Sequence, residues 1–400
     1  MSSERLPEPV FETAAAGAAV GLPEGVPAAL AGTAARSARL EIALVWAASR
    51  LLVLLCAALV QLTGFPRASR QPGFLEHPFA VLTTGDGRWY RIIAEHGYLL
   101  IPQSKSDPAF FPLLPILLRA LHSVGIPLDV TGLVLANGCF LVGLVALYEL
   151  GQAYLPEADA RRAAVFAALV PSGFAFSMVY PESLAFASLA LAGLFAVRRR
   201  WLAVLPLAAL AAFARPQGVL VALPLAAIAW RSWPTLSSSD RARASAAVLA
   251  PIATLAAIAA YFWATLGDPL AWTVAQRAWG RSFGVTGPVH ALVEVVTSPM
   301  HSGKVWLIRD AIFCAVFIAC ILLARRAGVP RGWTAMGLAV VLLPIASGSF
   351  TSDARFGLLA LPVYWGLAVA ARRKRAEWVL LAAFPILLAA GVFTITLRSP

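Results

Sequence analysis

Residues 201–230 read WLAVLPLAALAAFARPQGVLVALPLAAIAW, two apolar runs that meet at Arg215-Pro216. Each run has about 14 residues, so a helix formed by either would be roughly 21 Å long, shorter than the hydrocarbon core of a bilayer. Arg215 is therefore expected below the membrane surface, where an unpaired guanidinium costs several kcal/mol. A bound phosphate and a structural ion pair with Glu182 are equally good ways to compensate this charge.

The rest of the chain has the same apolar character. Hydrophobic residues make up 60% of the 400 and charged residues 13%, and the mean hydropathy is +0.78. These values lie outside the range of soluble globular proteins, and the alternating pattern of a β-barrel is absent. The sequence therefore predicts an all-α fold, a polytopic transmembrane helical bundle. The net charge of +12 is what Arg-rich cytoplasmic loops produce, so we expect no nucleic-acid partner.

Eleven runs are apolar enough to be predicted as membrane spans. They cover residues 41–63, 128–150, 162–178, 181–197, 201–214, 217–230, 244–266, 305–324, 333–347, 356–371 and 377–397. A further run at 109–124 is short, is broken by prolines and carries Arg119 and His122. We predict that this run is a re-entrant or interfacial segment that does not cross the membrane.

The distribution of Lys and Arg predicts the orientation. With eleven crossings, the basic loops RRR at 198–200, RRAGVPR at 325–331 and RRKR at 372–375 all fall on one side. That side has twice as many Lys and Arg residues as the other, so it is predicted to be cytoplasmic. The N-terminus is then cytoplasmic and the C-terminus lies outside.

The predicted domain organisation is simple. Residues 1–40 are rich in Ala, Gly and Pro without a helical stripe, which predicts a disordered cytoplasmic tail. Residues 41–400 form the transmembrane domain, with large outer loops at 64–108 and 267–304. The expected location is the cell membrane.

Polar residues from five distant stretches gather at the predicted outer face. Asp86 stands in TTGDGRW, Glu182 in YPES, Arg215 in ARPQG, Asp268 in GDPLAW, and Asp353 with Arg355 in TSDARFG. Acidic and basic groups that converge at one depth are typical of an active site or a permeation vestibule. The extracytoplasmic side is therefore where the chemistry is expected.

Local explanations compete for several of these residues. Asp86, between Gly85 and Gly87, would be a favourable N-cap for the amphipathic segment that follows. Trp89 and Tyr90 could stack on sugars, but Trp and Tyr are common at membrane interfaces. Neither His96 nor His122 has a second ligand at helical spacing, and the four cysteines lack metal-ligand spacing. No metal site is predicted, and metal dependence stays open.

Several motifs resemble those of a known family. The run DGRWYRIIAEHGY at 86–98, followed by AFFPLLP at 109–115, resembles the PIG-V family of mannosyltransferases, which add mannose to a lipid-linked glycan. The segment VPSGFAFSMVYPESLAF, the run ARPQG and the stretch GDPLAWTVAQRAWG are similar to family segments and follow in the same order. The resemblance covers about residues 41–370.

This resemblance implies a glycosyltransferase of the GT-C type that takes a sugar from a polyprenyl-phosphate donor and inverts the anomeric centre. The acceptor would be an extracytoplasmic lipid-linked or envelope glycan, and no cofactor is expected. Asp86 matches the family Asp and would be the general base. The same comparison gives donor phosphate-binding residues and acceptor or sugar-binding residues: Arg355 and Arg215 for the phosphate, and Trp89, Tyr90, His96, Glu182, Gln217, Asp268 and Gln276 for the acceptor or sugar.

The chain departs from the family pattern at two places. Gly85 stands where the family usually has Trp, and Pro216-Gln217 replace Ser-Asn, which leaves the identity of the sugar and the role of the second turn open. A transporter or flippase for a lipid-linked or anionic substrate would also need broken helices and a membrane Arg. The absence of an inverted repeat argues against that alternative, and the presence of Asp86 argues against a purely structural subunit.

Overall fold

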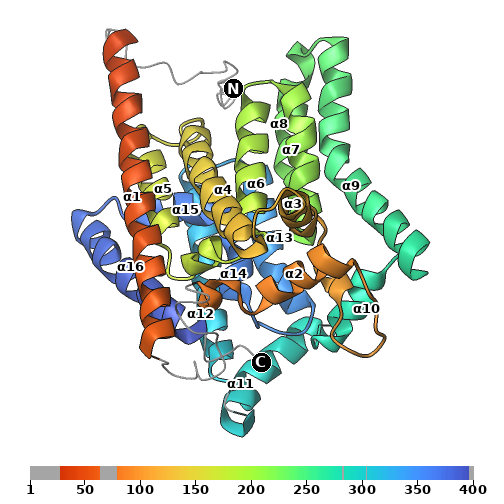
Figure 1. Cartoon of the computed structure of the whole chain (residues 1–400). Helices are drawn as coiled ribbons and strands as arrows, with labels where there is room; N and C mark the ends of the chain where they lie inside the picture. The colour runs from red at the N-terminus through yellow and green to blue at the C-terminus, as the bar shows by residue number, and fades with distance from the viewer. Residues whose placement is uncertain (1–27, 64–78, 282, 303, 396–400) are drawn as a thin grey trace, which may run out of the picture.

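The computed structural model describes residues 28–63, 79–281, 283–302 and 304–395, and within them every regular element is an α-helix or a 3₁₀-helix. The chain is an all-α membrane protein whose helices form one bundle (Figure 1). Long helices lie at the outside and shorter helices lie at the centre. The site described below lies where the central helices end.

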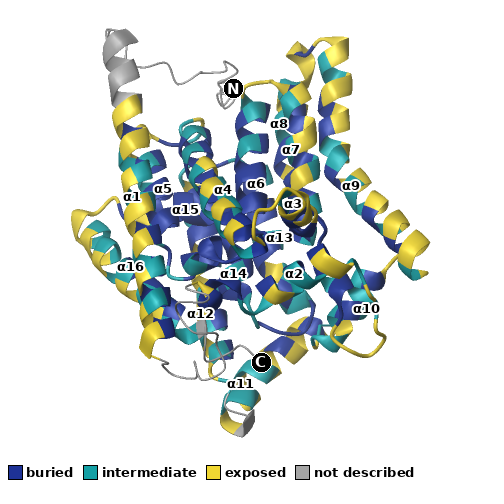
Figure 2. Cartoon of the chain, viewed as in Figure 1, coloured by how far each residue is buried: buried dark blue, intermediate teal, exposed yellow. Residues whose placement is uncertain are grey.

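Five described helices are long and apolar enough to cross a membrane. They are α1 (Ala28–Thr63), α4 (Leu128–Gly151), α9 (Ser238–Leu266), α12 (Trp306–Arg326) and α16 (Lys374–Ile395). Helices α1 and α9 flank the bundle on opposite sides, and their outer faces are exposed (Figure 2). On α1 the exposed leucines recur at intervals of three, four or seven residues, one or two helical turns, as a lipid-facing stripe requires: Leu40, Leu44, Leu51, Leu55, Leu59 and Leu62.

The central helices are shorter than the roughly 20 residues of a full span. They are α5 (Glu157–Leu169), α6 (Glu182–Val197), α7 (Trp201–Ala214), α8 (Ala222–Ser232), α13 (Arg331–Ala346) and α15 (Leu361–Ala370). Helix α6 is buried along almost its whole length. Small residues permit this close packing: a Cβ at Gly366 of α15 would lie only 1.9 Å from the Cys320 carbonyl oxygen of α12. The number of crossings that these short helices make stays a prediction.

Three of the predicted spans are interrupted. The run 162–178 contains the end of α5, Pro171 and then η4 (Gly173–Ser177). The run 217–230 starts as η5 (Pro216–Val221) before α8 begins, and the run 356–371 contains the end of α14 (Asp353–Phe356), η7 (Gly357–Leu359) and α15. Proline explains the first break, because Pro171 lacks a backbone donor and disfavours a helical conformation at Val170.

Shorter elements cover one end of the bundle. Helices α2 (Asp86–His96), α10 (Ala271–Ala278), α11 (Gly287–Ser302) and α14 lie at this end (Figure 1). Helix α3 (Leu113–His122) has ten residues, about 15 Å, which is shorter than the hydrocarbon core of a bilayer. That the run 109–124 does not cross the membrane stays a prediction. The remaining turns are η2 (Ala80–Thr83), η3 (Asp107–Ala109) and η6 (Trp233–Thr235).

The predicted boundary of the N-terminal tail is wrong. Helix α1 begins at Ala28, so residues 28–40 are helical and not part of a disordered tail. The sequence AALAGTAARSARL is rich in Ala, which has the highest helix propensity, and it extends a span that is already helical. Residues 1–27 of the predicted tail, and 64–78 of the first predicted outer loop, lie outside the described residues.

Candidate functional site

The first helix at this end of the bundle begins at Asp86. Gly85 is the N-cap residue of α2 and has φ 61°, so Asp86 is the first helical residue and the N-cap interpretation of its side chain is wrong. A Cβ at Gly85 would lie 2.5 Å from the Tyr180 hydroxyl oxygen. That hydroxyl accepts a hydrogen bond from the Asp86 backbone N–H at 3.3 Å. The missing side chain of Gly85 therefore allows Tyr180 to fix the start of α2.

The carboxylate of Asp86 forms an ion pair with Arg355. The distance from Oδ2 to Nη1 is 2.6 Å, and the two side chains keep 25% and 20% of their surface exposed. Arg355 also lies over the Tyr180 ring, with its Cζ 4.9 Å from the ring centroid. Burial opposes the charge on Arg355, but Asp86 and Glu182 hold its pKa above the ordinary value. The ion pair is held in place by these contacts, and both side chains remain accessible to solvent.

The short helix α14 that carries Arg355 is anchored by a buried acid. Ser352, directly before α14, has φ 70°, and its backbone N–H donates to Oδ2 of Asp310 at 2.8 Å. Asp310 belongs to α12 and is fully buried. A carboxylate that accepts a backbone N–H holds the left-handed turn and so directs Arg355 toward Asp86.

Glu182 connects the ion pair to Arg215. Glu182 is the first residue of α6 and is fully buried. Its Oε1 lies 3.1 Å from Nε of Arg355, within ion-pair distance, and forms a second ion pair with Nη1 of Arg215. Arg215, at the C-terminal end of α7, donates from Nε to Oε1 of Gln217 at 3.4 Å. Four predicted residues far apart in the sequence are thus joined by ion pairs, and Gln217 adjoins them.

A third arginine completes what we call the arginine cluster, defined as Arg215, Arg281 and Arg355. The three Cζ atoms lie 4.8, 4.9 and 5.2 Å from the centroid of the Phe356 ring. Sequence reasoning missed Arg281, which lies in the polar connection between α10 and α11 where an Arg needs no special explanation. Burial lowers its pKa to about 10, and the charge of Arg355 acts in the same direction.

Aromatic side chains pack together around α2, the helix that begins with Asp86. Trp89 of α2 stacks on Phe110 at 5.6 Å and meets Trp279 edge-on at 5.9 Å. Tyr90 is buried and packs edge-on against Phe110 at 5.3 Å. Both predicted aromatic residues therefore belong to one aromatic group on the helix that begins with Asp86, and the half-buried Trp89 is suited to contact a sugar face.

Three predicted site residues lie elsewhere. His96 ends α2 and is largely exposed beside Glu95. Asp268 accepts the Leu270 backbone N–H at 2.8 Å, a local turn contact, and the Gln276 side chain donates to the Ala109 carbonyl at 3.4 Å. His96 and Asp268 therefore have only local partners, whereas Gln276 connects α10 to η3, and the described contacts join none of the three to the ion pairs. The described residues contain no group of three or more His, Cys, Asp or Glu that could hold a metal ion.

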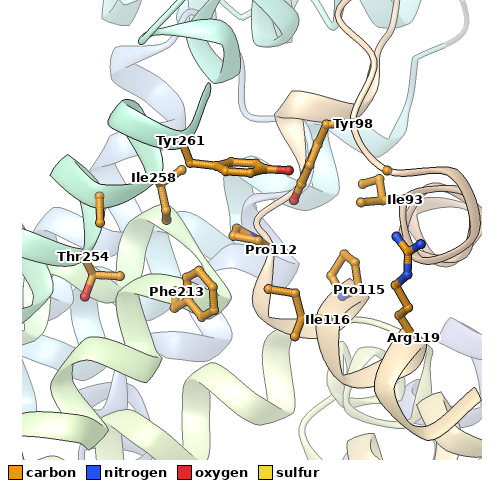
Figure 3. Close-up of a pocket in the computed structure, with 12 residues that line it drawn as sticks. Ile93, Tyr98, Pro112, Pro115, Ile116, Arg119, Phe213, Thr254, Ile258 and Tyr261 are labelled. Atoms are coloured by element: carbon orange, nitrogen blue, oxygen red, sulfur yellow. The ribbon is translucent and has the colours of Figure 1, made fainter. Parts of the chain in front are cut away.

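An apolar groove of about 420 Å³ lies between α2, α3, α7 and α9 (Figure 3). Its walls include Ile93, Tyr98, Ile116, Phe213, Ile258 and Tyr261, with Arg119 at one edge. Two of the helices that form its walls, α2 and α7, also carry or adjoin residues of the ion pairs. Ile93 follows Asp86 by two helical turns, roughly 10 Å, and Phe213 precedes Arg215 by two residues.

Comparisons with known proteins give only distant similarity. No protein-family model matches the chain, and no curated protein does. Among solved structures, an oligosaccharyltransferase of Archaeoglobus fulgidus in the apo form is 15% identical with a TM-score of 0.43, covering 86% of this chain and 56% of that chain. The oligosaccharyltransferase AglB of the same organism, in complex with an inhibitory peptide and a dolichol-phosphate, is 14% identical with a TM-score of 0.47, covering 89% and 55%. This chain spans little more than half the length of either structure, and neither similarity decides its activity.

Proposed function

We propose that the protein is a membrane glycosyltransferase of the GT-C type that moves mannose from a polyprenyl-phosphate donor to an extracytoplasmic lipid-linked or envelope glycan. The observation that carries this proposal is the ion-paired series Asp86, Arg355, Glu182 and Arg215. It places a partly exposed carboxylate beside cations that suit a phosphate. The choice of mannose rests on the resemblance of the surrounding motifs to the PIG-V family.

The chemistry requires a base and a site for the leaving group. Asp86 takes the proton from the acceptor hydroxyl while that oxygen attacks C1 of the sugar. The bond between C1 and the phosphate oxygen breaks, and its electron pair leaves with the polyprenyl phosphate. A single displacement inverts the anomeric centre. Arg355, which contacts Asp86 directly, stabilises the charge that develops on the phosphate, and Arg215 assists.

The apolar groove suits the lipid part of such a donor. It is lined by aliphatic and aromatic side chains and adjoins the ion pairs through α2 and the end of α7. An isoprenoid chain in this groove would place its phosphate toward the polar cluster. The half-buried Trp89 is proposed to contact the sugar or the acceptor.

The test is transfer of radiolabelled mannose from a synthetic polyprenyl-phosphomannose to membrane lipids by the purified protein. Asp86→Asn should lower the rate by about 10²- to 10⁴-fold, the usual contribution of a general base. Asp129→Asn is the matched control, because Asp129 also pairs with an arginine of α2 (Arg91, 2.8 Å) at similar exposure but outside the cluster. This control should keep its activity.

Polyprenyl-phosphoglucose tests the choice of sugar in parallel. Transfer of glucose alone would correct the sugar while supporting the reaction class. Full activity of a folded Asp86→Asn protein would overturn the role of the base. Transport of the intact lipid-linked sugar across a vesicle membrane, without transfer, would favour a flippase.

A further inference from the structure

The arginine cluster carries more positive charge than its carboxylates neutralise. Its three guanidinium groups surround the Phe356 ring. Asp86 pairs with Arg355, and Glu182 is shared by Arg355 and Arg215. The cluster therefore has three positive charges, of which the two on Arg215 and Arg355 are paired with two carboxylates.

Arg281 is the cation left over. Its hydrogen bonds go to neutral oxygen atoms, the Thr351 carbonyl at 2.6 Å and the Ser347 hydroxyl at 3.4 Å. In the described part of the chain no carboxylate lies within ion-pair distance of it. The nearby carboxyl of Asp353 is buried, and burial raises its pKa to about 8, against the opposing effect of the Cys314 thiol. At neutral pH Asp353 is mostly uncharged, whereas Arg281 stays protonated.

We infer that Arg281 is a phosphate-binding residue of this site, and that the cluster selects a lipid phosphate by its one unneutralised charge. The inference rests on the proposed function for the identity of the lipid. A guanidinium that already lies on the same ring as Arg215 and Arg355 can share one phosphate group with them. An anion of charge −1, such as the phosphodiester of a polyprenyl-phosphate sugar, would balance the cluster.

The net charge of the cluster changes during the proposed reaction. When Asp86 takes the acceptor proton, its charge disappears and Arg355 loses its carboxylate partner, so the excess charge of the cluster rises from one to two. At the same step the phosphodiester becomes a phosphate monoester, which carries up to two negative charges. The ligand therefore becomes more negative at the same step at which the cluster becomes more positive. Asp86→Asn imitates the protonated base and should bind polyprenyl monophosphate more tightly than the wild type.

A purely structural role for Arg281 has to be separated from this one. The turn 347–352 is also held by His290, whose Nδ1 lies 2.8 Å from the Gly348 carbonyl, and by Glu294, which accepts from the Ser349 hydroxyl at 2.7 Å. Arg281 is one of four side chains that hold this turn, the fourth being Asp310, which accepts from the Ser352 backbone N–H at 2.8 Å. If it acted only by holding the turn, loss of the His290 contact would have a comparable effect.

The experiment measures binding of short-chain polyprenyl monophosphate to the protein in nanodiscs, with polyprenol and inorganic phosphate as parallel ligands. Arg281→Gln should weaken the polyprenyl monophosphate at least about tenfold, as expected for loss of a charge-assisted hydrogen bond, and should leave polyprenol unchanged. Two variants serve as controls and should bind like the wild type: Arg277→Gln, which removes an exposed charge on α10, and His290→Ala, which removes a contact to the turn. Asp86→Asn should bind the monophosphate about tenfold more tightly.

Each result decides the inference. An equal loss in Arg281→Gln and His290→Ala, or an equal loss for polyprenol, would overturn the role of the charge. Inorganic phosphate bound as tightly as the lipid phosphate would overturn selection of a lipid. This assay measures binding and involves no transfer. Unchanged binding in Arg281→Gln would contradict the inference about Arg281, whereas absence of sugar transfer in the other assay would contradict the proposed function.

Discussion

Two buried arginine sites in this membrane protein differ in their partners. Arg50, in the middle of α1, is 3% exposed and donates to the carbonyls of Ala168 and Gly173 at 3.0 and 2.9 Å. It also donates to the Ser177 hydroxyl at 3.0 Å and lies over the Phe140 ring. In the arginine cluster the partners are carboxylates, an aromatic ring and a surface that is partly open.

The difference shows that a membrane arginine is not by itself a functional signal. Arg50 satisfies backbone carbonyls near the end of α5 and in η4 that would otherwise lack donors. The N–H groups of its guanidinium are bonded to oxygen atoms of this chain. The arginine cluster holds a charge that the chain does not fully neutralise, and this excess gives an anion a reason to bind.

The largest effect should come from breaking the centre of the cluster with Glu182→Gln. Both Arg355 and Arg215 lose a buried partner, and removal of one member of a buried ion pair typically costs about 3–5 kcal/mol. We expect this loss in the free energy of unfolding, measured by denaturant titration in micelles, together with loss of transfer. Addition of Arg215→Gln should recover part of the stability, because it removes an unpaired cation. A stable Glu182→Gln protein would show that the cluster does not depend on this acid.

A smaller effect, on stability alone, should follow from Arg50→Leu. Two backbone carbonyls lose their charged donor, and the expected destabilisation is on the order of 3 kcal/mol. The transfer rate per folded molecule should stay at the wild-type level, because Arg50 does not contact the cluster. The midpoint of unfolding and the rate should be measured on the same preparation. A specific loss of activity at unchanged stability would remove the distinction between the two sites.

The smallest effect concerns Asp353 and pH. The folded protein keeps this proton up to about pH 8, whereas the unfolded chain releases it near the ordinary value of 3.8. Unfolding therefore releases a proton in this window, and stability attributable to Asp353 falls as the pH rises through it. Asp353→Asn should lack this decline, which over one pH unit within the window, such as pH 6 to 7, amounts to about 1.4 kcal/mol or a few °C in the unfolding midpoint. Its affinity for polyprenyl monophosphate at pH 7 should equal that of the wild type, and weaker or tighter binding would mean that Asp353 is charged there.

The sequence predicted the helical membrane fold and the meeting of Asp86, Glu182, Arg215 and Arg355. It could do so because charged residues at the ends of apolar runs need partners, and few other charges were available. Arg281 escaped notice because an arginine in a polar loop needs no partner. Arg50 lies within an apolar run, but nothing in its neighbours along the chain indicates the carbonyls of α5 that it contacts.

Other differences have local causes. His96 and Asp268 were predicted to join the site from motif resemblance, but surface loops can satisfy polar groups on their own. The short central helices could be placed from hydropathy, whereas the breaks in η4 and η5 depend on how proline and tertiary contacts divide each run. The C-terminal ends of α1 and α9 agree with the predicted runs 41–63 and 244–266, whereas both helices begin earlier than predicted, at Ala28 and Ser238.

The contact between Gly85 and Tyr180 has an evolutionary consequence. Because a Cβ at position 85 would collide with the Tyr180 hydroxyl, a descendant of this protein cannot gain a side chain at 85 while keeping Tyr180 in place. Tyr180 in turn supports the guanidinium of Arg355. The two positions, distant along the chain, should therefore be inherited as a pair, and a homologue with a large residue at the first should have a smaller one at the second.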